Sequence, residues 1–540
     1  MRARRRAAAV STLTVLVLGA GTGVARAESP TGEPPATPVA PLAWAGCGTT
    51  AEATAAGVEC ATADLPMDYD EPGGERVQIA VARVPATDPA TRIGSLFFNF
   101  GGPGGPAVDY LQTVGAGVFA ALNQRFDIVG FDPRGVGQST PAVECQSDQG
   151  MQDLQSPQFP TPLDIDVDAY VAEAQTYVDA CLANNGEILE HLSTANVARD
   201  LDVLRAAVGD EQLSYLGFSY GTFLGATYAS LFPDNHRAMV LDGAVDADEY
   251  INDPFSSRAV QTAAFETALA RFTEACAVDQ VACSGFGGTD PYLAYDQLLG
   301  AAEAAPLPAG GYPPDPRPVT ADDIRAATLT LLYAKQLWGL LGAALADAAA
   351  GDGSSIRALL HQVVYTDVAS SDRFFTISAS EQRYPQDDLD VYLDRGAESW
   401  ASFPHFWFTS GYSEIPFALW PARDEDAFGG PFEVSESSAT PLVIGTTYDP
   451  ATPYADAVSL VADLGNARLL TMEGDGHTAY GGKSACIDAS TEAYLVAGTL
   501  PAPGTVCSQT VPFTAPAPVP VAAATATQLL LVPGLTAWLR

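Results

Sequence analysis

Ser219 lies in the segment Gly217-Phe218-Ser219-Tyr220-Gly221, which has the G-x-S-x-G pattern of a nucleophilic serine. Such a serine sits on a sharp turn between a strand and a helix, where its hydroxyl is exposed. Glycines are expected at both ends of the pattern because side chains there would collide with the turn and the neighbouring strand. The pattern alone is weak evidence in a glycine-rich chain, so the prediction depends on the flanking elements and on partner residues.

The flanking residues favour the nucleophile. Residues 213–217 are a short apolar run typical of a buried strand, and residues 221–232 have the pattern of a helix. Backbone N–H groups at the start of such a helix can stabilise a developing negative charge. The alternative is a serine packed in the core between two glycines, which the strand before and the helix after the pattern disfavour.

A serine hydroxyl needs a base to remove its proton, and the base needs an orienting acid. The expected chain order after this type of turn is serine, acid, histidine. The five histidines are His191, His236, His361, His405 and His477. Only His477 follows a late strand on a glycine-rich loop, so we predict it as the base. Asp449, at the end of the preceding strand, is the predicted acid, and Asp475, close to His477 along the loop, is the alternative.

The tetrahedral intermediate needs two backbone N–H donors in an oxyanion hole. One is predicted to be the amide of Tyr220, directly after the nucleophile. The other is expected from the glycine-rich loop FFNFGGPGGPA, which follows an earlier strand, and Gly102 is the predicted donor. The alternative interpretation of this loop is a simple glycine turn.

Short apolar runs alternate with helical segments along the chain. We expect strands at residues 77–84, 95–100, 126–131, 213–217, 238–243, 441–449 and 467–474. The clearest helix is residues 193–209, where Ser193 or Thr194 can cap the start and Gly209 ends it. This alternation predicts an α/β fold, with a mostly parallel sheet and helices on both faces.

The alternation stops after Asp242 and resumes near residue 441. Residues 245–436 are alanine-rich, helical and irregular, which predicts a large, mainly helical cap inserted into the core. The core then comprises residues 45–244 and 437–511. Residues 512–540 are expected to form a loose tail; a membrane anchor there is the alternative, which the prolines disfavour.

The amino-terminal residues predict export. Residues 1–27 combine four early arginines, an apolar stretch at 7–20 and the cleavage-like Ala25-Arg26-Ala27. A transmembrane anchor is the alternative, but the apolar stretch is too short to span a bilayer. Residues 28–44 are rich in Pro, Thr and Ala and are expected to be a loose leader. The mature protein is therefore expected to be secreted.

The chain has eight cysteines, and none lies in residues 1–27. In an oxidising compartment an even number predicts disulfides rather than catalytic thiols or metal ligands. Sequence proximity favours the pairs Cys47–Cys60, Cys145–Cys181, Cys276–Cys283 and Cys486–Cys507, although other pairings are possible. There is no C-x-x-C pair with zinc-like spacing, and the sequence predicts no metal and no cofactor.

The formal net charge is −39 at pH 7, and the sequence pI is about 4.2. Such a surface repels nucleic acid and anionic membranes, so neither is an expected partner. We interpret most of the excess acid as a solubilising surface. A smaller share can attract cationic substrate ends, such as a peptide amino terminus. The sequence does not predict the oligomeric state.

Six segments resemble, in the same order, those of secreted actinobacterial tripeptidyl aminopeptidases, relatives of the proline iminopeptidases among the α/β-hydrolase serine peptidases. They are GGPGGPA, FDPRGVGQS, GFSYGTFLG, LDGAVD, YDPATPY and GDGHTAY, and the resemblance covers about residues 45–510. It implies an α/β-hydrolase fold and an exopeptidase that removes short peptides or single residues from free amino termini. It also implies a cap that closes one end of the cleft, and carboxylates that bind the substrate α-ammonium group. In the second segment, we interpret Asp132 and Arg134 as structural, part of an Arg–carboxylate pair that ties the loop to the sheet.

Two segments depart from the family pattern. An Ile-x-Cys-x-Asp motif of the family, aligned on Ile377, falls on Ala379 and Glu381, and the segment around Trp420 lacks the second cysteine. The two cysteines are lost together, and the acid is a longer glutamate. The resemblance therefore implies a pocket of different shape, and it does not fix a tripeptide as the released unit.

The acidic segment LDGAVDADEY lies where the core passes into the predicted cap. Asp242 is interpreted as structural, while Asp246, Asp248 and Glu249 are candidates for binding the substrate ammonium. Asp246 is the favoured candidate, and Glu381 is a second one from the cap. The alternative for each of the three in the segment is a solvated acidic turn.

The sequence thus predicts a secreted serine aminopeptidase of tripeptidyl or prolyl type. Ser219 would attack the carbonyl, His477 would act as base and then as acid, and Asp449 would orient it. The first alternative is a secreted carboxylesterase or lipase, because the core residues do not encode the leaving group. The second is a catalytically inactive binding protein, which the intact set of three residues disfavours.

Overall fold

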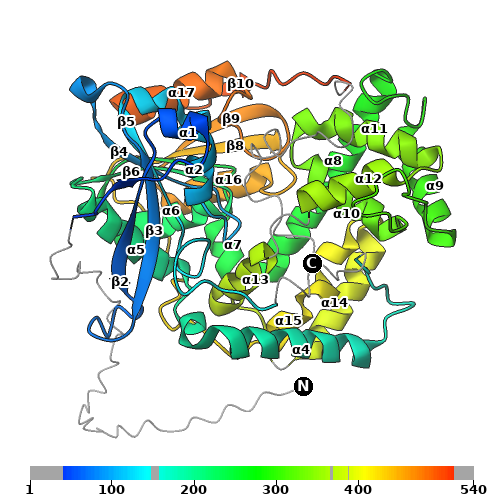
Figure 1. Cartoon of the computed structure of the whole chain (residues 1–540). Helices are drawn as coiled ribbons and strands as arrows, with labels where there is room; N and C mark the ends of the chain where they lie inside the picture. The colour runs from blue at the N-terminus through cyan, green and yellow to red at the C-terminus, as the bar shows by residue number, and fades with distance from the viewer. Residues whose placement is uncertain (1–40, 147–156, 365–368, 387, 516–540) are drawn as a thin grey trace, which may run out of the picture. The chain divides into compact units, whose positions relative to one another are not determined.

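The computed structural model describes residues 41–146, 157–364, 369–386 and 388–515 (Figure 1). The predicted signal segment 1–27, most of the leader 28–44 and most of the tail 512–540 lie outside these ranges. No helix within them combines the length and the apolar character that a bilayer-spanning segment needs.

A ten-stranded sheet carries the predicted core, in the order β1-β2-β3-β5-β4-β6-β7-β8-β9-β10. The strands from β4 to β10 run parallel to one another. At one edge β1, β2 and β3 pair antiparallel, and β3 is also antiparallel to β5. Their bounds are β1 Ala45–Gly46, β2 Glu59–Pro66, β3 Arg76–Val84, β4 Gly94–Asn99, β5 Phe126–Phe131, β6 Leu213–Phe218, β7 His236–Asp242, β8 Leu442–Tyr448, β9 Arg468–Asp475 and β10 Val506–Ser508. The predicted mostly parallel sheet is confirmed.

Each predicted strand forms, and its apolar residues supply at least half of its buried positions. Strands β4, β5 and β6 are buried at every residue, as expected for parallel strands covered by helices. Strands β1, β2 and β10 were not predicted; β1 has only two residues. In β2 small and polar residues alternate between buried and exposed positions, and β10 has only three residues.

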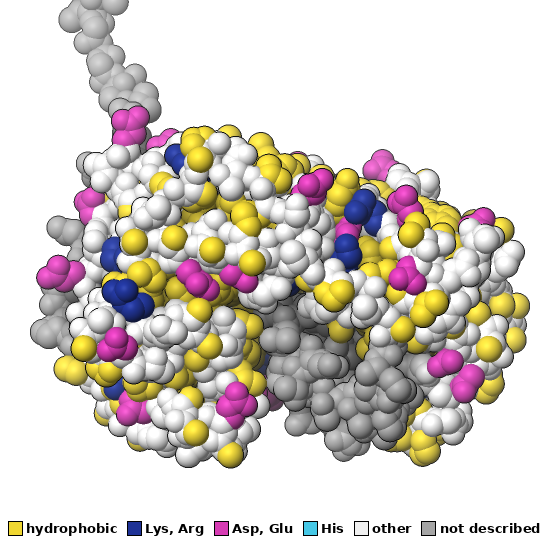
Figure 2. All heavy atoms as spheres, turned by 90° about the horizontal axis from the view of Figure 1, so that it is seen from above, with side chains coloured by type: hydrophobic (Ala, Val, Ile, Leu, Met, Phe, Trp, Pro, Cys, Tyr) yellow, Lys and Arg dark blue, Asp and Glu magenta, His cyan; other side chains and the backbone are white. Residues whose placement is uncertain are grey.

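Helices cover both faces of this sheet (Figure 1). On one face lie α5 (Thr194–Ala207), α6 (Tyr220–Leu231) and α16 (Tyr454–Leu464), and on the other α1 (Ala51–Ala55), α2 (Val108–Val114) and α17 (Ala485–Ala497). Ser193 caps α5 by accepting the N–H of Asn196, as the sequence predicts. Figure 2 shows Asp and Glu side chains spread over the visible face rather than gathered in one patch.

Strands β7 and β8 are parallel neighbours, although residues 243–441 separate them along the chain. We call residues 243–441 the insertion; it contains the range for which the sequence predicts a cap. Its α-helices are α7 Ala247–Asn252, α8 Pro254–Val278, α9 Pro291–Ala304, α10 Ala321–Leu332, α11 Trp338–Ala349, α12 Ser354–Leu359, α13 Ala369–Glu381, α14 Leu389–Ser402 and α15 Ile415–Ala418. Part of the insertion has a hydrophobic core of its own, around Phe272, Ile324, Trp338 and Phe406. Helix α4 (Val167–Asn185), which precedes the insertion in sequence, packs against α15 (Figure 1).

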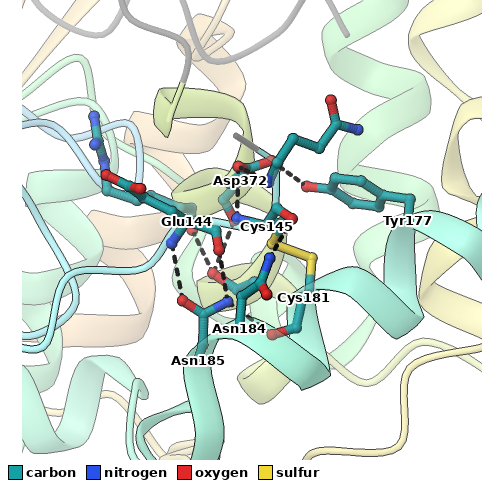
Figure 3. Close-up of a disulfide and its surroundings, with 10 residues drawn as sticks. Glu144, Cys145, Tyr177, Cys181, Asn184, Asn185 and Asp372 are labelled. Carbon is teal, nitrogen blue, oxygen red and sulfur yellow. Dashed lines mark hydrogen bonds between the residues drawn. A yellow bond between two sulfur atoms is a disulfide. The ribbon is translucent and has the colours of Figure 1, made fainter. Parts of the chain in front are cut away.

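The eight cysteines form four disulfides, in the pairs that sequence proximity favours: Cys47–Cys60, Cys145–Cys181, Cys276–Cys283 and Cys486–Cys507. The second of these joins the chain after β5 to helix α4 (Figure 3). Asp372 of α13 lies beside it; its carboxylate accepts the Cys145 N–H at 2.8 Å and the Tyr177 hydroxyl at 2.8 Å. Three segments far apart in sequence therefore meet at this disulfide.

Arg134 forms a fully buried ion pair with Asp200 of helix α5. Its Nε and one terminal nitrogen donate to the two carboxylate oxygens at 2.8 Å and 2.7 Å, and neither side chain is exposed. The guanidinium also donates to the carbonyls of Met67 and His191. Asp132 instead accepts backbone N–H groups of its own loop and of the start of α2. The structural pair predicted around Arg134 therefore has Asp200 as its carboxylate.

Replacing Arg134 by Met should lower the free energy of unfolding by about 3–5 kcal/mol, because Asp200 would remain as an uncompensated buried charge. The matched control is Arg76→Met, which breaks the exposed pair with Asp64, whose side chains are 38% and 58% exposed. That change should cost less than about 1 kcal/mol. Urea denaturation of the two variants measures the difference; equal losses would contradict this account of Arg134.

Candidate active site

Ser219 occupies the turn between strand β6 and helix α6. Its backbone has φ 56° and ψ −129°, in the positive-φ region that residues other than glycine rarely adopt. At Gly217 an added Cβ would lie 2.2 Å from the Gly221 carbonyl oxygen, and at Gly221 it would lie 2.7 Å from the Asn99 carbonyl oxygen. The turn therefore requires both glycines, for the reason that the sequence analysis gives.

The glycine-rich loop after β4 lies directly against this turn. At Gly101, whose φ is +89°, an added Cβ would lie 3.0 Å from the Ser219 Cβ. The Gly101 N–H donates to Asn99 Oδ1 at 2.8 Å. The next residue, Gly102, lines a pocket together with Ser219 and Tyr220. The two residues from which the sequence predicts oxyanion donors are thus brought to the same pocket as the serine.

The imidazole of His477 and the carboxylate of Asp449 form a buried pair. Nδ1 of His477 lies 2.9 Å and 3.0 Å from the two carboxylate oxygens, and the residues are 5% and 2% exposed. The carboxylate also accepts the N–H groups of Ala451 and Thr452 at 2.9 Å and of Thr478 at 3.1 Å. As an acceptor fixed by these donors, Asp449 keeps the proton on Nδ1 and leaves Nε2 as the basic nitrogen.

Asp242, the last residue of β7, joins the serine turn to the histidine loop. Its backbone carbonyl accepts the Ser219 N–H at 2.9 Å, and its carboxylate accepts the Ala479 and Tyr480 N–H groups at 2.9 Å and 2.8 Å. Burial raises the pKa of this carboxyl, although these N–H bonds oppose the rise. At the adjacent Gly243 an added Cβ would lie 3.1 Å from Cε1 of His477. Ser219 and the imidazole therefore flank the same turn.

The pocket beside Ser219 lies between the sheet and the insertion and measures about 560 Å³, including its open mouth. The sheet side contributes Gly102, Ser219, Tyr220, Ala451, Thr452 and Asp456. The insertion contributes Val245, Tyr250, Pro254, Ser257, Arg258, Gln261, Phe374, Gln382 and Tyr384. Thr452 connects the pocket to the buried pair, because its hydroxyl lies 3.2 Å from Nδ1 of His477. Its mixed polar and apolar lining suits a small organic substrate or a peptide end.

Asp456, in the first turn of α16, gives this pocket a carboxyl group. Burial raises its pKa to about 8, and the neighbouring carboxylates of Asp246, Glu249 and Asp449 contribute in the same direction. A positive charge bound beside Asp456 would relieve this repulsion. A cation bound there would lower this pKa and favour the charged form of Asp456.

Gln382, from the insertion, also lines this pocket. It is 3% exposed, and its Nε2 donates to the Tyr250 carbonyl at 3.0 Å. Its Oε1 is buried and has no hydrogen-bond partner among the described residues. A buried acceptor without a donor is costly.

The two carboxylates predicted to bind substrate are engaged elsewhere, and neither lines the pocket. Asp246 caps helix α7 by accepting the Glu249 N–H at 2.9 Å. Glu381 is 4% exposed, and its oxygens accept the N–H and the hydroxyl of Thr194 at 2.7 Å and 2.9 Å. Burial raises the pKa of Glu381 to about 8. Its longer side chain therefore reaches the start of helix α5 rather than the pocket.

Asp475, the alternative acid, binds two cations of the insertion: Arg271 and Lys335, whose Nζ lies 2.7 Å from the carboxylate. The histidines other than His477 have partners away from Asp449. The backbone carbonyl of His191 accepts a hydrogen bond from Arg134. The imidazole of His236 contacts the Ala439 carbonyl, that of His361 the Tyr312 hydroxyl, and that of His405 the carboxylates of Glu266 and Asp296.

Sequence reasoning missed Asp456 and Gln382. Asp456 lies in the helix that follows the strand of Asp449, so an acid one turn into that helix was an available signal. Gln382 comes from a remote part of the insertion, and nothing in its local sequence marks it. Among the described residues, no group of His, Cys, Asp and Glu side chains is arranged to hold a metal ion.

Comparison with known proteins agrees with the α/β fold of the chain. The sequence profile of the α/β hydrolase fold matches residues 96–483. The serine protease Hip1 of Mycobacterium tuberculosis is 34% identical over 469 residues, which cover 84% of this chain and 87% of that protein. The tripeptidyl aminopeptidase of Streptomyces lividans is 32% identical over 471 residues, or 84% of each chain. Carboxylesterase B of M. tuberculosis is 33% identical over 463 residues, which cover 83% of this chain and 86% of that protein.

A fluorophosphonate reagent, which reacts with activated serine hydroxyls, should modify Ser219. Mass spectrometry of a digest should locate the adduct there, and Ser219→Ala should abolish it. Asp449→Asn should slow labelling by about 10³- to 10⁴-fold, because the imidazole would lose its orientation and tautomer. The control is Ser257→Ala, a second serine of the pocket lining, which should leave labelling intact. Full labelling of the Ser219 variant would contradict the assignment.

Proposed function

Because the chain belongs to the α/β-hydrolase family, we propose that it is a secreted serine aminopeptidase that releases tripeptides or other short units from free amino termini. One observation carries the proposal: the pocket that contains Ser219 also contains the carboxyl group of Asp456. A hydroxyl that can form an acyl-enzyme and an acid that can bind an ammonium group are what an aminopeptidase needs. The names of two relatives, a serine protease and a tripeptidyl aminopeptidase, support the same class.

In the proposed mechanism, Ser219 Oγ attacks the carbonyl carbon of the scissile peptide while Nε2 of His477 takes the hydroxyl proton. Asp449 holds the imidazole and stabilises the imidazolium. The N–H groups of Gly102 and Tyr220 bind the oxyanion. His477 then gives the proton to the leaving amine, and the C–N bond breaks. Water, deprotonated by the same imidazole, hydrolyses the acyl-enzyme and frees Ser219.

The substrate amino terminus would bind at Asp456 and Gln382. An α-ammonium group donates up to three hydrogen bonds, and Asp456 and Gln382 both line the pocket. A rotation of the Gln382 side chain would present its Oε1, which has no hydrogen-bond partner among the described residues, to the bound ammonium. A charge-assisted bond of this kind contributes about 1.5–3 kcal/mol. Such an anchor fixes the distance from the amino terminus to Ser219 and so favours release of a short unit.

The insertion would limit the length of that unit. Its aromatic residues Tyr250, Phe374 and Tyr384 and the start of α8 line the side of the pocket opposite the sheet. A wall of this kind suits an exopeptidase better than an endopeptidase, because a long chain has no room to continue past it. The tripeptide as the released unit rests on the name of the Streptomyces relative.

Export is proposed from two features. The four disulfides are typical of proteins that fold in an oxidising compartment. Residues 1–27 have the composition of a cleaved signal. Peptides with a free amino terminus would then be met outside the cell.

Acetylating the amino terminus of a chromogenic peptide should lower kcat/KM by about tenfold or more, because the charge bound by Asp456 is lost. Asp456→Asn should cause a similar fall for the free peptide and little change for the acetylated one. The control is Asp463→Asn, an exposed acid of the same helix α16 that does not line the pocket. Equal kcat/KM for free and acetylated peptides would overturn the aminopeptidase proposal.

The pH profile for free peptides should be bell-shaped, with its maximum near pH 8. In the empty pocket the raised pKa of about 8 keeps Asp456 protonated at lower pH, so its charged form appears as the pH rises. The peptide α-amino group, with an ordinary pKa of about 7.7–8.0, loses its charge over the same range. Steady-state kinetics between pH 5 and 10 should show this maximum, and Asp456→Asn should remove it. A profile unchanged by that substitution would be evidence against the amine site.

Esterase activity is the second candidate, favoured by the similarity to carboxylesterase B. The same Ser219 chemistry can act on esters, because the leaving group is not encoded by the core. Short-chain p-nitrophenyl esters assayed beside the peptide panel separate the two. A kcat/KM for esters that far exceeds every free peptide would favour this candidate.

A further inference from the structure

We infer that Asp475 is a positioning residue for His477: by binding two cations of the insertion, it fixes the loop that presents the imidazole. The inference rests on the proposed role of His477 as catalytic base. It gives the insertion a part in the chemistry in addition to forming a wall of the pocket. Asp475 does not line that pocket, so it would act through the histidine and not on the substrate.

The carboxylate of Asp475 lies at the end of β9, two residues before His477, and the residue is 4% exposed. One oxygen accepts Nε of Arg271 from helix α8. The other accepts Nζ of Lys335 at 2.7 Å, from the short helix η5 (Lys335–Leu337). The two cations come from separate helices of the insertion, and their side chains are 32% and 21% exposed. A nearly buried carboxylate is thus held by two groups that the sheet does not provide.

Backbone contacts extend this attachment to the histidine itself. The His477 N–H donates to the Tyr333 carbonyl at 2.6 Å, at the end of helix α10. The Tyr333 ring also meets the imidazole edge-on, with 5.6 Å between the ring centres. At Gly476, whose φ is +92°, an added Cβ would lie 3.0 Å from the Tyr333 carbonyl oxygen and 3.2 Å from the Lys335 nitrogen. The main chains of the insertion and of the histidine loop are therefore in direct contact.

The core holds the loop from the other direction. Nζ of Lys483 donates to the His477 and Thr478 carbonyls and to the Thr478 hydroxyl, at 2.7 Å, 3.2 Å and 2.7 Å. Asp449 accepts the Thr478 N–H. The backbone donor of His477 is thus satisfied by the insertion, and its backbone acceptor by the core. If Asp475 lost its charge, Arg271 and Lys335 would lose their shared counter-ion and repel each other, while the backbone bond from His477 to Tyr333 would remain.

The experiment removes the charge of Asp475 while keeping its shape. Asp475→Asn should lower kcat on a free-amine peptide p-nitroanilide by about tenfold or more, since small misplacements of a catalytic group have effects of this size. KM should stay within about twofold, because the pocket lining is unchanged. The rate of fluorophosphonate labelling of Ser219, which needs the base but no peptide, should fall in parallel. Because Asp475 acts through Arg271 and Lys335, Asp475→Asn should lower kcat little further in a variant that already carries Arg271→Gln and Lys335→Gln.

A matched control is Asp426→Asn, which breaks another ion pair between core and insertion: Arg199 of α5 with Asp426, at 3.1 Å and with side chains 22% and 23% exposed. It should leave kcat and labelling unchanged. Wild-type kcat and labelling in Asp475→Asn, or an equal loss in Asp426→Asn, would overturn the inference. If Asp475→Asn does not melt cooperatively, Arg271→Gln decides: a severalfold lower kcat supports the inference, and wild-type kcat overturns it. His477→Gln tests the proposed function separately. Full labelling of Ser219 in that variant would show that His477 is not the base.

Discussion

The turn at the end of β7 holds together segments on which the candidate site depends. The backbone carbonyl of Asp242 binds the amide of Ser219, and its buried carboxylate binds the chain just after His477. The backbone carbonyl and the side-chain carboxylate of this one residue thus connect the serine turn to a loop more than two hundred positions away in sequence. Burying that carboxylate is costly, and the N–H groups of the histidine loop are what offset the cost. The loop can therefore occupy few other positions without leaving the charge unsatisfied.

The insertion takes part in this arrangement at several points. Consecutive residues of helix α13 serve different regions: Asp372 binds the Cys145–Cys181 loop, Arg373 donates to the Gly104 carbonyl in the glycine-rich loop at 3.0 Å, and Phe374 lines the pocket. Because one helix turn contacts all three, the shape of the pocket is coupled to the disulfide and to the loop that carries Gly102. A helical segment that is inserted in sequence between two paired strands can make such contacts without disturbing the sheet.

Charge is arranged differently on the surface and in the pocket. On the face that Figure 2 shows, the acidic side chains are dispersed, and the whole sequence carries a net charge of −39. Inside, Asp456 and Glu381 have pKa values raised to about 8, mainly by burial. Both carboxylate oxygens of Glu381 accept hydrogen bonds from Thr194. The Thr194 hydroxyl in turn lies 2.5 Å from the hydroxyl of Tyr220, the residue after the nucleophile. Asp456 faces the pocket. Two acids with similar titration thus differ in what they can bind, because only one has room for a ligand.

The sequence by itself determined the parallel sheet, the serine turn and the residues expected at it. Buried parallel strands have continuous apolar runs, and a strand–serine–helix turn needs glycines at fixed positions, so local sequence carries both signals. Asp449 and His477 followed from their places after late strands. The tertiary structure alone decided which acid enters the pocket: Asp456 rather than Asp246 or Glu381. It also decided that Asp200 is the partner of Arg134 and that Arg271 and Lys335 hold Asp475. These are contacts between distant segments, and they depend on the path of the insertion, which helical periodicity does not specify.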